Sequence, residues 1–309
     1  MHILAVTQYT HSQLDQLFTR ADELRNYSSP KQRKELAELH KGRQLCSLFY
    51  EPSTRTRLSF EAAAVKLGMG VVSTENAREF SSAAKGETIE DTIRVLDAYN
   101  FDIIVLRHHE TGAAARAAKV SQTPIINAGD GKGEHPTQAL LDAYTIYRQF
   151  GRLDNLHIVM GGDLANGRTV RSLAQLLSSY PNNRITFVSM PELQIGEDIK
   201  DVLKASKTAF QETIDMSSAF KTADIVYWTR LQKERLADPS TLPTDGFVLD
   251  PEILTHLPAH AIIMHPLPRV DEISPLTDSD PRAKYFEQAG NGLYVRMALL
   301  DQIISKRII

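Results

Sequence analysis

Short runs of apolar residues, mostly unbroken by polar ones, recur along the chain and alternate with segments of helical periodicity. The runs occupy residues 45–50, 102–106, 123–127, 157–161, 184–189, 223–228 and 261–264. Such runs are typical of parallel strands that are buried on both faces. Between them, segments such as 56–67, 136–150 and 170–180 carry apolar residues at helical spacing. The alternation predicts an α/β protein in which helices flank two parallel sheets.

The length of the chain fits two domains. Its 309 residues correspond to about two domains of roughly 150 residues each. The division should fall near the long helical segment 136–150, because the segment 151–156 that follows it carries Gly, Arg, Asp and Asn, and a new apolar run then begins. We therefore expect an interdomain helix at 136–150.

Composition narrows the class of protein. A hydrophobic content of 42%, a charged content of 24% and a net charge of −3 are ordinary for a globular protein, so we expect neither a nucleic acid nor a membrane as partner. No apolar stretch approaches the roughly 20 residues of a membrane span, and the run at 3–6 is too short for a signal peptide. The single cysteine, Cys46, lies among apolar neighbours, which predicts a buried thiol and a reducing cytoplasm.

Polar residues follow the predicted strands, at the edge of a parallel sheet where ligands bind. Arginine recurs among them, which indicates a polyanionic ligand because guanidinium pairs bidentately with phosphate and carboxylate. The residues in question are Glu51 to Arg57, Arg107, His108, Asp130, His135 to Gln138, Asp163, Gly167 to Thr169, Thr229 to Gln232 and His265 to Arg269.

The turn after the first run is the most informative. Ser53 and Thr54 precede a helix whose apolar positions include Leu58 and Val65. A strand-to-helix turn directs backbone N–H groups and the positive end of the helix dipole at an anion, and Arg55 adds charge. Taken alone, the turn fits equally well with Ser53 as an ordinary helix cap and solvent-exposed arginines.

The motif Ser53-Thr-Arg-Thr-Arg57 resembles the carbamoyl phosphate site of the transcarbamoylase family. The resemblance continues in order along nearly the whole chain, and this ordered set is far more specific than any one motif. The further matching residues are Phe60-Glu61, Ser81 with Lys85-Gly-Glu-Thr88 (similar to the family's mobile loop), His135-Pro-Thr-Gln138, Gly167-Arg-Thr169 and His265-Pro-Leu-Pro268.

The second substrate is expected to be L-aspartate. Ornithine-specific members typically carry Cys at the position of Pro266, whereas the Lys85 loop, Pro266 and the segment 229–235 resemble the aspartate-specific branch. The two carboxylates of aspartate favour a site with guanidinium groups, which would repel the cationic side chain of ornithine.

The resemblance implies a role for each matching residue. It implies catalytic roles for Arg55, Thr56, Lys85, Arg107 and His135. It implies carbamoyl phosphate binding by Ser53, Thr54, Arg55, Thr56, Ser81, Arg107, His135, Gln138 and the backbone of Pro266 and Leu267. For aspartate it implies Arg168 at the α-carboxylate, and Lys85, Arg230 and Gln232 at the β-carboxylate. No cofactor or metal is expected.

The resemblance also implies an architecture and an assembly. We expect a carbamoyl phosphate domain at 1–135 joined by a C-terminal helix at 292–309, an aspartate domain at 151–291, and an active site in the cleft between them. In this family Ser81 and Lys85 reach into the neighbouring subunit's site, so we expect a homotrimer with shared active sites. Regulatory chains or a dihydroorotase are further candidate partners.

The expected reaction is direct attack of the aspartate amine on carbamoyl phosphate, because the motifs contain no covalent nucleophile with a base beside it. Thr56, Arg107 and His135 would stabilise the charge that develops on the carbonyl oxygen. The departing phosphate is itself a suitable proton acceptor. The products would be N-carbamoyl-L-aspartate and phosphate, in pyrimidine biosynthesis.

Three alternatives were open. Residues 162–169 have the spacing of a nucleotide-binding P-loop, but carry Arg168 where a P-loop has Lys. A ligand-binding protein without catalytic activity could share the same fold. Metal binding has little support, since we expect His108 and His109 to point to opposite faces of a strand end.

Ala165-Asn166 departs from the family, whose members often have a basic residue followed by Tyr or His.

Overall fold

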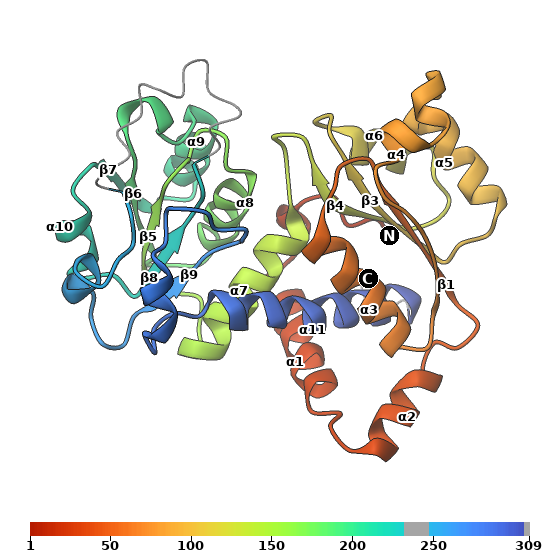
Figure 1. The fold of residues 1–309 in the computed structure, drawn as a ribbon, viewed down its shortest axis with the longest axis horizontal. Coiled ribbons are helices and arrows are strands. Elements are labelled where there is room, and N and C mark those ends of the chain that lie inside the picture. Colours follow the sequence, from red (N-terminus) through yellow and green to blue (C-terminus); the bar gives the residue numbers. More distant parts are fainter. Residues whose placement is uncertain (232–246, 306–309) are drawn as a thin grey trace. The chain divides into compact units, whose positions relative to one another are not determined.

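The computed structural model describes residues 1–231 and 247–305. The chain divides into two compact units, each an α/β unit of its own (Figure 1). Unit 1 consists of Met1–Tyr144 and Gly290–Ile309, and unit 2 of Thr145–Ala289. Two helices, α7 (Pro136–Phe150) and α11 (Tyr285–Ile304), contribute residues to both units.

Unit 1 contains a four-stranded parallel sheet in the order β2-β1-β3-β4. Its strands are β1 (Gln44–Phe49), β2 (Gly70–Thr74), β3 (Ile103–His108) and β4 (Ile125–Asp130). Its other helices are the 3-10 helix η1 (Val6–Gln8), α1 (His11–Arg25), α2 (Pro30–Glu38), α3 (Thr54–Lys66), α4 (Ala77–Phe80), the 3-10 helix η2 (Ser82–Lys85), α5 (Ile89–Ala98) and α6 (Ala113–Val120). The chain leaves β1 toward β2 on one side and later returns to β3 on the other. The order therefore reverses between β1 and β3, where open parallel sheets bind ligands.

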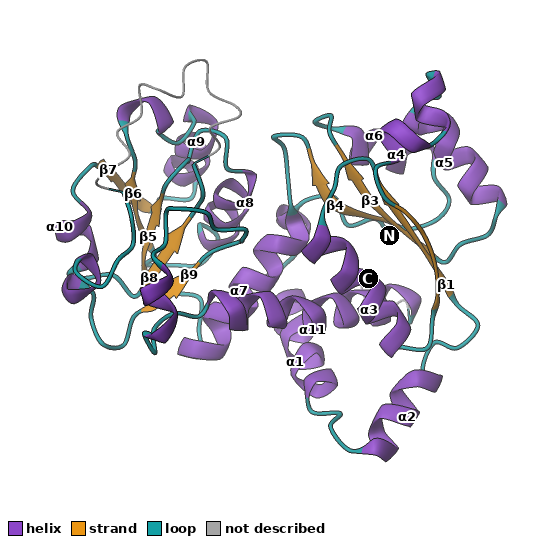
Figure 2. Cartoon of the chain, in the orientation of Figure 1, coloured by secondary structure: helices purple, strands orange, loops and turns teal. Residues whose placement is uncertain are grey.

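Helices cover both faces of this sheet, with α5 and α6 on one side and α3 on the other (Figure 2). Alternate residues of β1, Cys46 and Leu48, pack with Ile89 and Ile93 of α5. Cys46 is buried, as the sequence predicts, and burial raises the pKa of its thiol to about 12. The thiol therefore stays protonated and serves as a small core residue.

Unit 2 contains a five-stranded parallel sheet in the order β7-β6-β5-β8-β9. Its strands are β5 (His157–Gly161), β6 (Arg184–Val188), β7 (Ala209–Thr213), β8 (Ile225–Trp228) and β9 (Ile262–Met264). Its helices are α8 (Arg168–Leu177), α9 (Glu197–Ala205), α10 (Met216–Phe220) and the 3-10 helices η3 (Pro191–Leu193), η6 (Ile253–His256) and η7 (Pro275–Ser279). Here the order reverses between β5 and β8.

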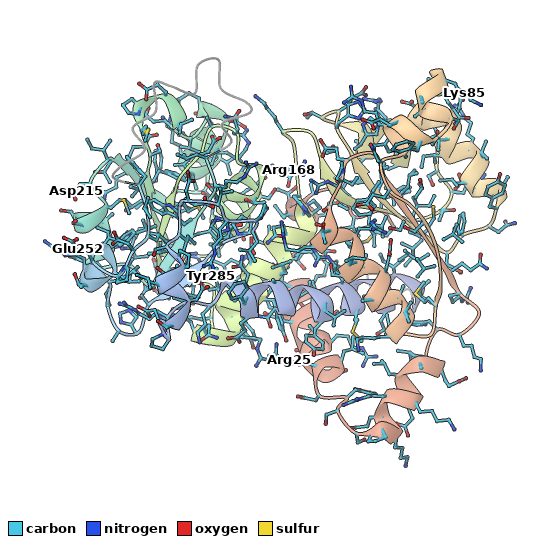
Figure 3. The ribbon with its side chains drawn as sticks, in the orientation of Figure 1. Arg25, Lys85, Arg168, Asp215, Glu252 and Tyr285 are labelled. Carbon is cyan, nitrogen blue, oxygen red and sulfur yellow. The ribbon has the colours of Figure 1, made fainter. Side chains whose placement is uncertain are left out.

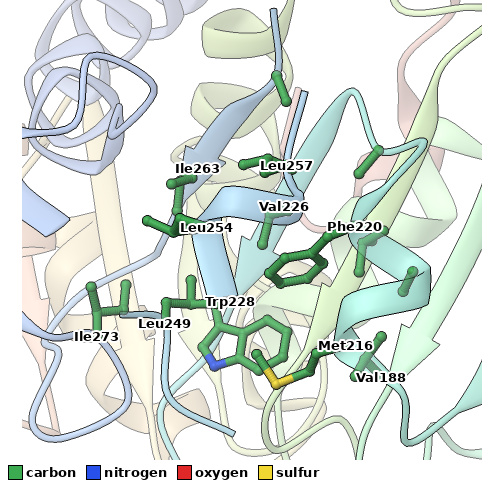
Figure 4. Packing of buried hydrophobic residues seen from close by; sticks show 14 of the residues in the cluster. Val188, Met216, Phe220, Val226, Trp228, Leu249, Leu254, Leu257, Ile263 and Ile273 are labelled. Atoms are coloured by element: carbon green, nitrogen blue, oxygen red, sulfur yellow. The ribbon is translucent and has the colours of Figure 1, made fainter. Parts of the chain in front are cut away.

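Trp228, the last residue of β8, anchors a core of unit 2 (Figure 4). Its ring meets Phe220 edge-on, with the centroids 6.0 Å apart, and its indole N–H donates to the carbonyl oxygen of Phe247 at 3.1 Å. On the neighbouring strand, a Cβ at Gly161 would lie only 2.0 Å from this ring. Position 161 must therefore be glycine for β5 to pass beside Trp228.

All the predicted strands exist, with ends that differ by at most three residues, but two strands were not predicted. Strands β2 and β7 lie at the edges of their sheets and mix exposed with half-buried residues. A search for unbroken apolar runs cannot find such strands, because they keep exposed positions, whereas the other two edge strands, β4 and β9, are fully buried. The predicted ends of β3 and β4 were also too early, since Arg107, His108 and Asp130 lie within these strands.

Helices α3 and α8 begin at Thr54 and Arg168, ahead of their predicted starts. Within the described ranges, no helix combines the length and the apolar character needed to cross a bilayer.

Candidate active site

The turn between β1 and α3 leaves backbone donors available. Ser53 is the N-cap residue, but its side chain accepts no hydrogen bond from the first turn. The interpretation of Ser53 as an ordinary side-chain cap is therefore wrong. The first main-chain bond into the helix runs from the N–H of Arg57 to the carbonyl oxygen of Ser53, at 3.1 Å. The N–H groups of Thr54, Arg55 and Thr56 have no acceptor within the helix, which suits an anion at this helix terminus.

The two arginines of this motif differ in their surroundings. Arg57 is paired with Glu61 at 3.2 Å and Glu75 at 2.8 Å, so it ties α3 to the residue after β2. Arg55 is exposed and forms no ion pair with any acid in the described ranges. Partial burial lowers the pKa of Arg55, and its guanidinium still remains charged near neutral pH. Arg55 is thus the arginine that is available to a ligand.

Arg107 lies beside this turn, where the strand order reverses. It is the register partner of Phe49, and its carbonyl oxygen accepts from the N–H of Tyr50 at 2.9 Å. Its side chain donates to the carbonyl oxygen of Ala128 at 3.4 Å, and its Nε lies 3.4 Å from Oε2 of Glu51. These contacts hold the guanidinium between the ends of β1 and β4.

His135 and Gln138 follow the loop after β4. Asp130 shapes that loop, because its carboxylate accepts from the N–H groups of Gly112 at 2.9 Å and Glu134 at 3.1 Å. His135 is buried, and its carbonyl oxygen accepts from the N–H of Gln138 at 3.0 Å in the first turn of α7. Since β1, β3 and β4 are neighbours, the structure brings Thr56, Arg107, His135 and Gln138 to one edge of the unit 1 sheet.

Ser81 and Lys85 are not part of this group within their own chain. The Ser81 hydroxyl donates to the carbonyl oxygen of Ala77 and accepts from the N–H of Ala83 at 3.2 Å. Lys85 is exposed, at the edge of unit 1 and well away from α3 (Figure 3). It forms no ion pair with a residue that the structure describes.

The unit 2 sheet carries a second pair of arginines at its carboxyl edge. Arg168 is the first residue of α8, after the turn that follows β5, and Arg230 lies two residues after the end of β8 (Figure 3 labels Arg168). In that turn the buried carboxylate of Asp163 accepts from the N–H of Asn166 at 3.0 Å and from its side-chain amide at 3.2 Å. Asn166, which departs from the family, therefore stabilises the turn that leads to Arg168.

The same contacts count against the P-loop alternative. Besides the Asp163 contacts, a Cβ at Gly162 would lie 2.1 Å from the carbonyl oxygen of Thr229, and one at Gly167 would lie 2.6 Å from that of Asp163. The glycines of this segment serve close backbone packing rather than an open cradle for phosphates.

The turn after β9 is rigidly held. Buried His265 accepts the N–H of Leu267 at Nδ1, at 2.8 Å, and its Nε2 lies 2.8 Å from Oε1 of Glu272. Burial acts to raise the pKa of Glu272, but hydrogen bonds, chiefly from His265, hold it below its usual value. Leu267 has a left-handed φ of 54°, a conformation that costs a non-glycine residue about 1 kcal/mol or more. The network thus fixes the backbone of Pro266 and Leu267 at the end of β9.

The rings of His108 and His109 stack at 4.3 Å, so the prediction that they point to opposite faces is wrong, because His109 lies beyond the end of β3. Gln232 lies outside the described residues. Sequence reasoning missed Asp142, which accepts a hydrogen bond from Gln138; the available signal was the spacing of four residues on a predicted helix.

Within residues 1–231 and 247–305, no cluster of three or more His, Cys, Asp or Glu side chains is arranged to hold a metal ion.

Comparisons with known proteins give consistent matches for both halves of the chain. Residues 1–148 match the carbamoyl-P binding domain of aspartate/ornithine carbamoyltransferase, and residues 154–303 match its Asp/Orn binding domain. The chain is 50% identical over 310 residues to the chloroplastic aspartate carbamoyltransferase of Oryza sativa subsp. japonica. That match covers 99% of this chain and 85% of the relative.

Two solved structures are similar over nearly the full length. The catalytic subunit of M. jannaschii aspartate transcarbamoylase matches with a TM-score of 0.89 and 43% identity, over 99% of this chain and 98% of that one. The Trypanosoma cruzi aspartate transcarbamoylase in complex with carbamoyl aspartate and phosphate matches with a TM-score of 0.87 and 38% identity, over 97% and 94% of the two chains.

Proposed function

Because the chain belongs to the aspartate/ornithine carbamoyltransferase family, we propose that it transfers the carbamoyl group of carbamoyl phosphate to the amino group of L-aspartate. The products are N-carbamoyl-L-aspartate and phosphate, and the reaction is a step of pyrimidine biosynthesis. The observation that carries the proposal is the pairing of Phe49 with Arg107, which brings Arg107 beside the Ser53–Thr56 turn.

The phosphate of carbamoyl phosphate binds the turn at the start of α3. The N–H groups of residues 54–56 and the hydroxyls of Ser53, Thr54 and Thr56 donate to its oxygens, while Arg55 and Arg107 supply positive charge. The exposed, unpaired state of Arg55 supports this role, since an arginine already bound to an acid would have to break that pair first.

The carbamoyl group lies against Thr56, Arg107, His135 and Gln138. The first three donate to the carbonyl oxygen, where negative charge develops in the transition state. Removing one such donor costs about 3 kcal/mol in comparable sites. The side-chain oxygen of Gln138 and the backbone carbonyls of Pro266 and Leu267 accept from the carbamoyl NH₂.

Arg168 and Arg230 bind aspartate. Arg168 holds the α-carboxylate, and Arg230 holds the β-carboxylate with Gln232 and with Lys85 of a neighbouring subunit. The fixed backbone between β5 and β8 supports this assignment, because two guanidinium groups at a set separation select a short dicarboxylate. Ornithine would place an ammonium group among these cations.

The reaction proceeds by direct attack. The neutral amine of aspartate forms a bond to the carbamoyl carbon, the bond from that carbon to the phosphate oxygen breaks, and the amine proton passes to the departing phosphate. The protein contributes the alignment of two anionic substrates and the stabilisation of the developing oxyanion.

A homotrimer with shared sites completes the proposal. Phe80, directly before Ser81, is 79% exposed, and Val65 of α3 and Val72 of edge strand β2 are also largely exposed. Exposed apolar side chains on α3 and β2, which are in contact, suit a second copy of the chain as partner. The distance of Lys85 from α3 in its own chain supports its use by a neighbour (Figure 3).

We propose a cytoplasmic location for the enzyme, supported by the reduced thiol that Cys46 retains when buried. The rice relative is named chloroplastic. A fluorescent fusion of the complete protein in its own cells tests this, and fluorescence confined to plastids would contradict it.

The test of the function is a carbamoylation assay over a panel of amino acids. With carbamoyl phosphate, L-aspartate should yield carbamoyl aspartate and stoichiometric phosphate, while asparagine and ornithine should yield little. Preference for ornithine would contradict the substrate assignment. No turnover with any amino acid, together with measurable carbamoyl phosphate binding, would favour the non-catalytic alternative.

A further inference from the structure

The side-chain amide of Gln138 is hydrogen-bonded to a buried carboxylate. Its Nε2 donates to Oδ1 of Asp142 at 2.9 Å, one turn further along α7 and within unit 1. Asp142 is 0% exposed and Gln138 is 9% exposed, so bulk water offers neither group a competing partner. Such a contact between buried groups has a defined orientation.

The chemistry of the two groups fixes that orientation. A glutamine amide has an oxygen that accepts and an NH₂ that donates, and a half-turn of its terminal torsion exchanges them. An ionised carboxylate only accepts hydrogen bonds. Asp142 therefore requires the NH₂ of Gln138 on its own side, which turns the side-chain oxygen Oε1 the other way.

A buried cation favours the ionised form of Asp142. Arg296 of α11 is buried, and burial lowers its pKa to about 10 while the charge of Asp142 acts in the opposite direction. Arg296 therefore stays positive near neutral pH. Its guanidinium carbon lies 5.1 Å from the centroid of the Phe60 ring on α3. A Cβ at Gly292 would lie 2.4 Å from an Arg296 nitrogen, so glycine leaves the room that this guanidinium occupies.

We propose that Asp142 is a positioning residue that locks the amide of Gln138 with Oε1 toward the carbamoyl NH₂, and so selects a carbamoyl group over an acyl group that lacks N–H donors. This inference rests on the proposed function, in which Gln138 accepts from the carbamoyl NH₂. A reversed amide would set its own NH₂ against that of the substrate and weaken binding. Arg296 supports the lock by balancing the charge of Asp142.

Acetyl phosphate is the matched probe, because a methyl group replaces the NH₂ while the phosphate and the carbonyl remain. Affinities of the assembled enzyme for carbamoyl phosphate and acetyl phosphate are measured by calorimetry for the wild type, Asp142→Asn, Gln138→Ala and the double variant. Asparagine keeps the shape of aspartate but also donates, so it permits the reversed amide.

The preference for carbamoyl over acetyl phosphate should fall on the order of tenfold in Asp142→Asn, through weaker binding of carbamoyl phosphate alone. Gln138→Ala should lose the preference, and the double variant should match Gln138→Ala, since Asp142 acts through Gln138. Asp301→Asn is the control. It alters another buried acid of unit 1, paired with Arg20 at 2.7 Å and His40 at 2.8 Å, and should leave the preference unchanged.

The measurements distinguish failure of the proposed role of Gln138 from failure of the positioning role of Asp142. If Gln138→Ala keeps the preference, the role of Gln138 in the proposed function is wrong. If Gln138→Ala loses the preference but Asp142→Asn keeps it, or weakens both ligands equally, the positioning role is overturned.

Should Asp142→Asn fail to fold, the wild type still gives an answer. The Gln138 side-chain NH₂, identified in an amide NMR spectrum by its loss in Gln138→Ala, should exchange slowly with water, with and without carbamoyl phosphate. Exchange as fast as that of exposed Gln16 would overturn the proposal.

Discussion

Thr229 donates both its backbone N–H and its hydroxyl to the carbonyl oxygen of Gly161, at 2.9 and 3.0 Å. These two hydrogen bonds join the ends of β5 and β8, the strands that lead to Arg168 and Arg230. The neighbouring Gly162 has a φ of +97° and no room for a side chain beside Thr229. The separation of the two arginine backbones is therefore fixed by the sheet rather than set by the ligand.

Replacing Arg230 with alanine should weaken aspartate binding selectively. The β-carboxylate loses a charged donor, so kcat/KM for aspartate should fall by about 100-fold or more, while carbamoyl phosphate affinity stays nearly unchanged. Steady-state kinetics with aspartate, asparagine and ornithine measure this. Arg184→Ala is the control. Arg184 is an exposed arginine at the amino end of β6, at the edge of the sheet opposite to the carboxyl edge near Arg230. A variant that keeps full discrimination for aspartate would disprove the assignment of Arg230.

Arg55→Ala should remove most of the activity and little of the stability. The loss in kcat should reach about 3 kcal/mol, two orders of magnitude, if Arg55 stabilises the transition state. Because Arg55 is exposed and has no acidic partner in the described ranges, unfolding free energy should change by about 0.5 kcal/mol or less. Kinetics and urea denaturation measure the two effects. Arg43→Ala, which removes an exposed arginine paired with Asp102, should leave kcat unchanged.

Mixing inactive Lys85→Ala and inactive Arg55→Ala subunits should restore activity. If one chain supplies Arg55 and its neighbour supplies Lys85, reassembled mixtures contain some sites with both native residues. The assay follows phosphate release after dissociation and reassembly, with each variant reassembled alone as the control. Mixed trimers verified by mass spectrometry that regain no activity would refute sharing.

His108 should make the stability of the enzyme depend on pH. Burial, followed by the neighbouring His109, lowers the pKa of His108 to about 4, well below the usual value near 6.5. The unfolded chain therefore binds a proton more readily between these values. The contribution of neutral His108 to the free energy of unfolding is complete above about pH 6.5 and is lost as the pH falls toward 4. The total loss is on the order of 3 kcal/mol.

Urea denaturation of the wild type and His108→Asn tests this, because asparagine keeps an acceptor for the N–H of Glu110, which lies 3.1 Å from Nδ1 of His108. The stability difference between the two proteins should shrink as the pH falls from 7 to 4.5. A constant difference for His108→Asn would contradict the expectation.

The sequence predicts the central architecture because burial on both faces leaves a visible pattern. Strands β1, β5 and β8 are nearly unbroken apolar runs, and their carboxyl ends carry the motif residues Ser53, Arg168 and Arg230. Edge strands β2 and β7 keep polar residues because one side remains open to water. A search for unbroken apolar runs therefore misses them.

Side-chain relationships were harder to predict than strands. The motif contains both Arg55 and Arg57, and only the fold shows that Glu61 and Glu75 bind the second. The stacking of His108 on His109 depends on where β3 ends, a boundary that periodicity places only to within a few residues. Asp142 escaped notice because a spacing of four residues on a helix is common, and it does not by itself show that both side chains are buried and in contact.

The indole of Trp228 gives unit 2 its own optical reporter. It is the only tryptophan of the chain, fully buried and two residues before Arg230. Fluorescence excited at the red edge of protein absorption therefore comes from unit 2 alone. Aspartate or succinate, added to enzyme saturated with carbamoyl phosphate or phosphate, should shift this emission through the strand that carries Arg230. Unliganded enzyme that receives phosphate should retain its spectrum, so one intrinsic fluorophore distinguishes the binding of aspartate from the binding of phosphate without a label.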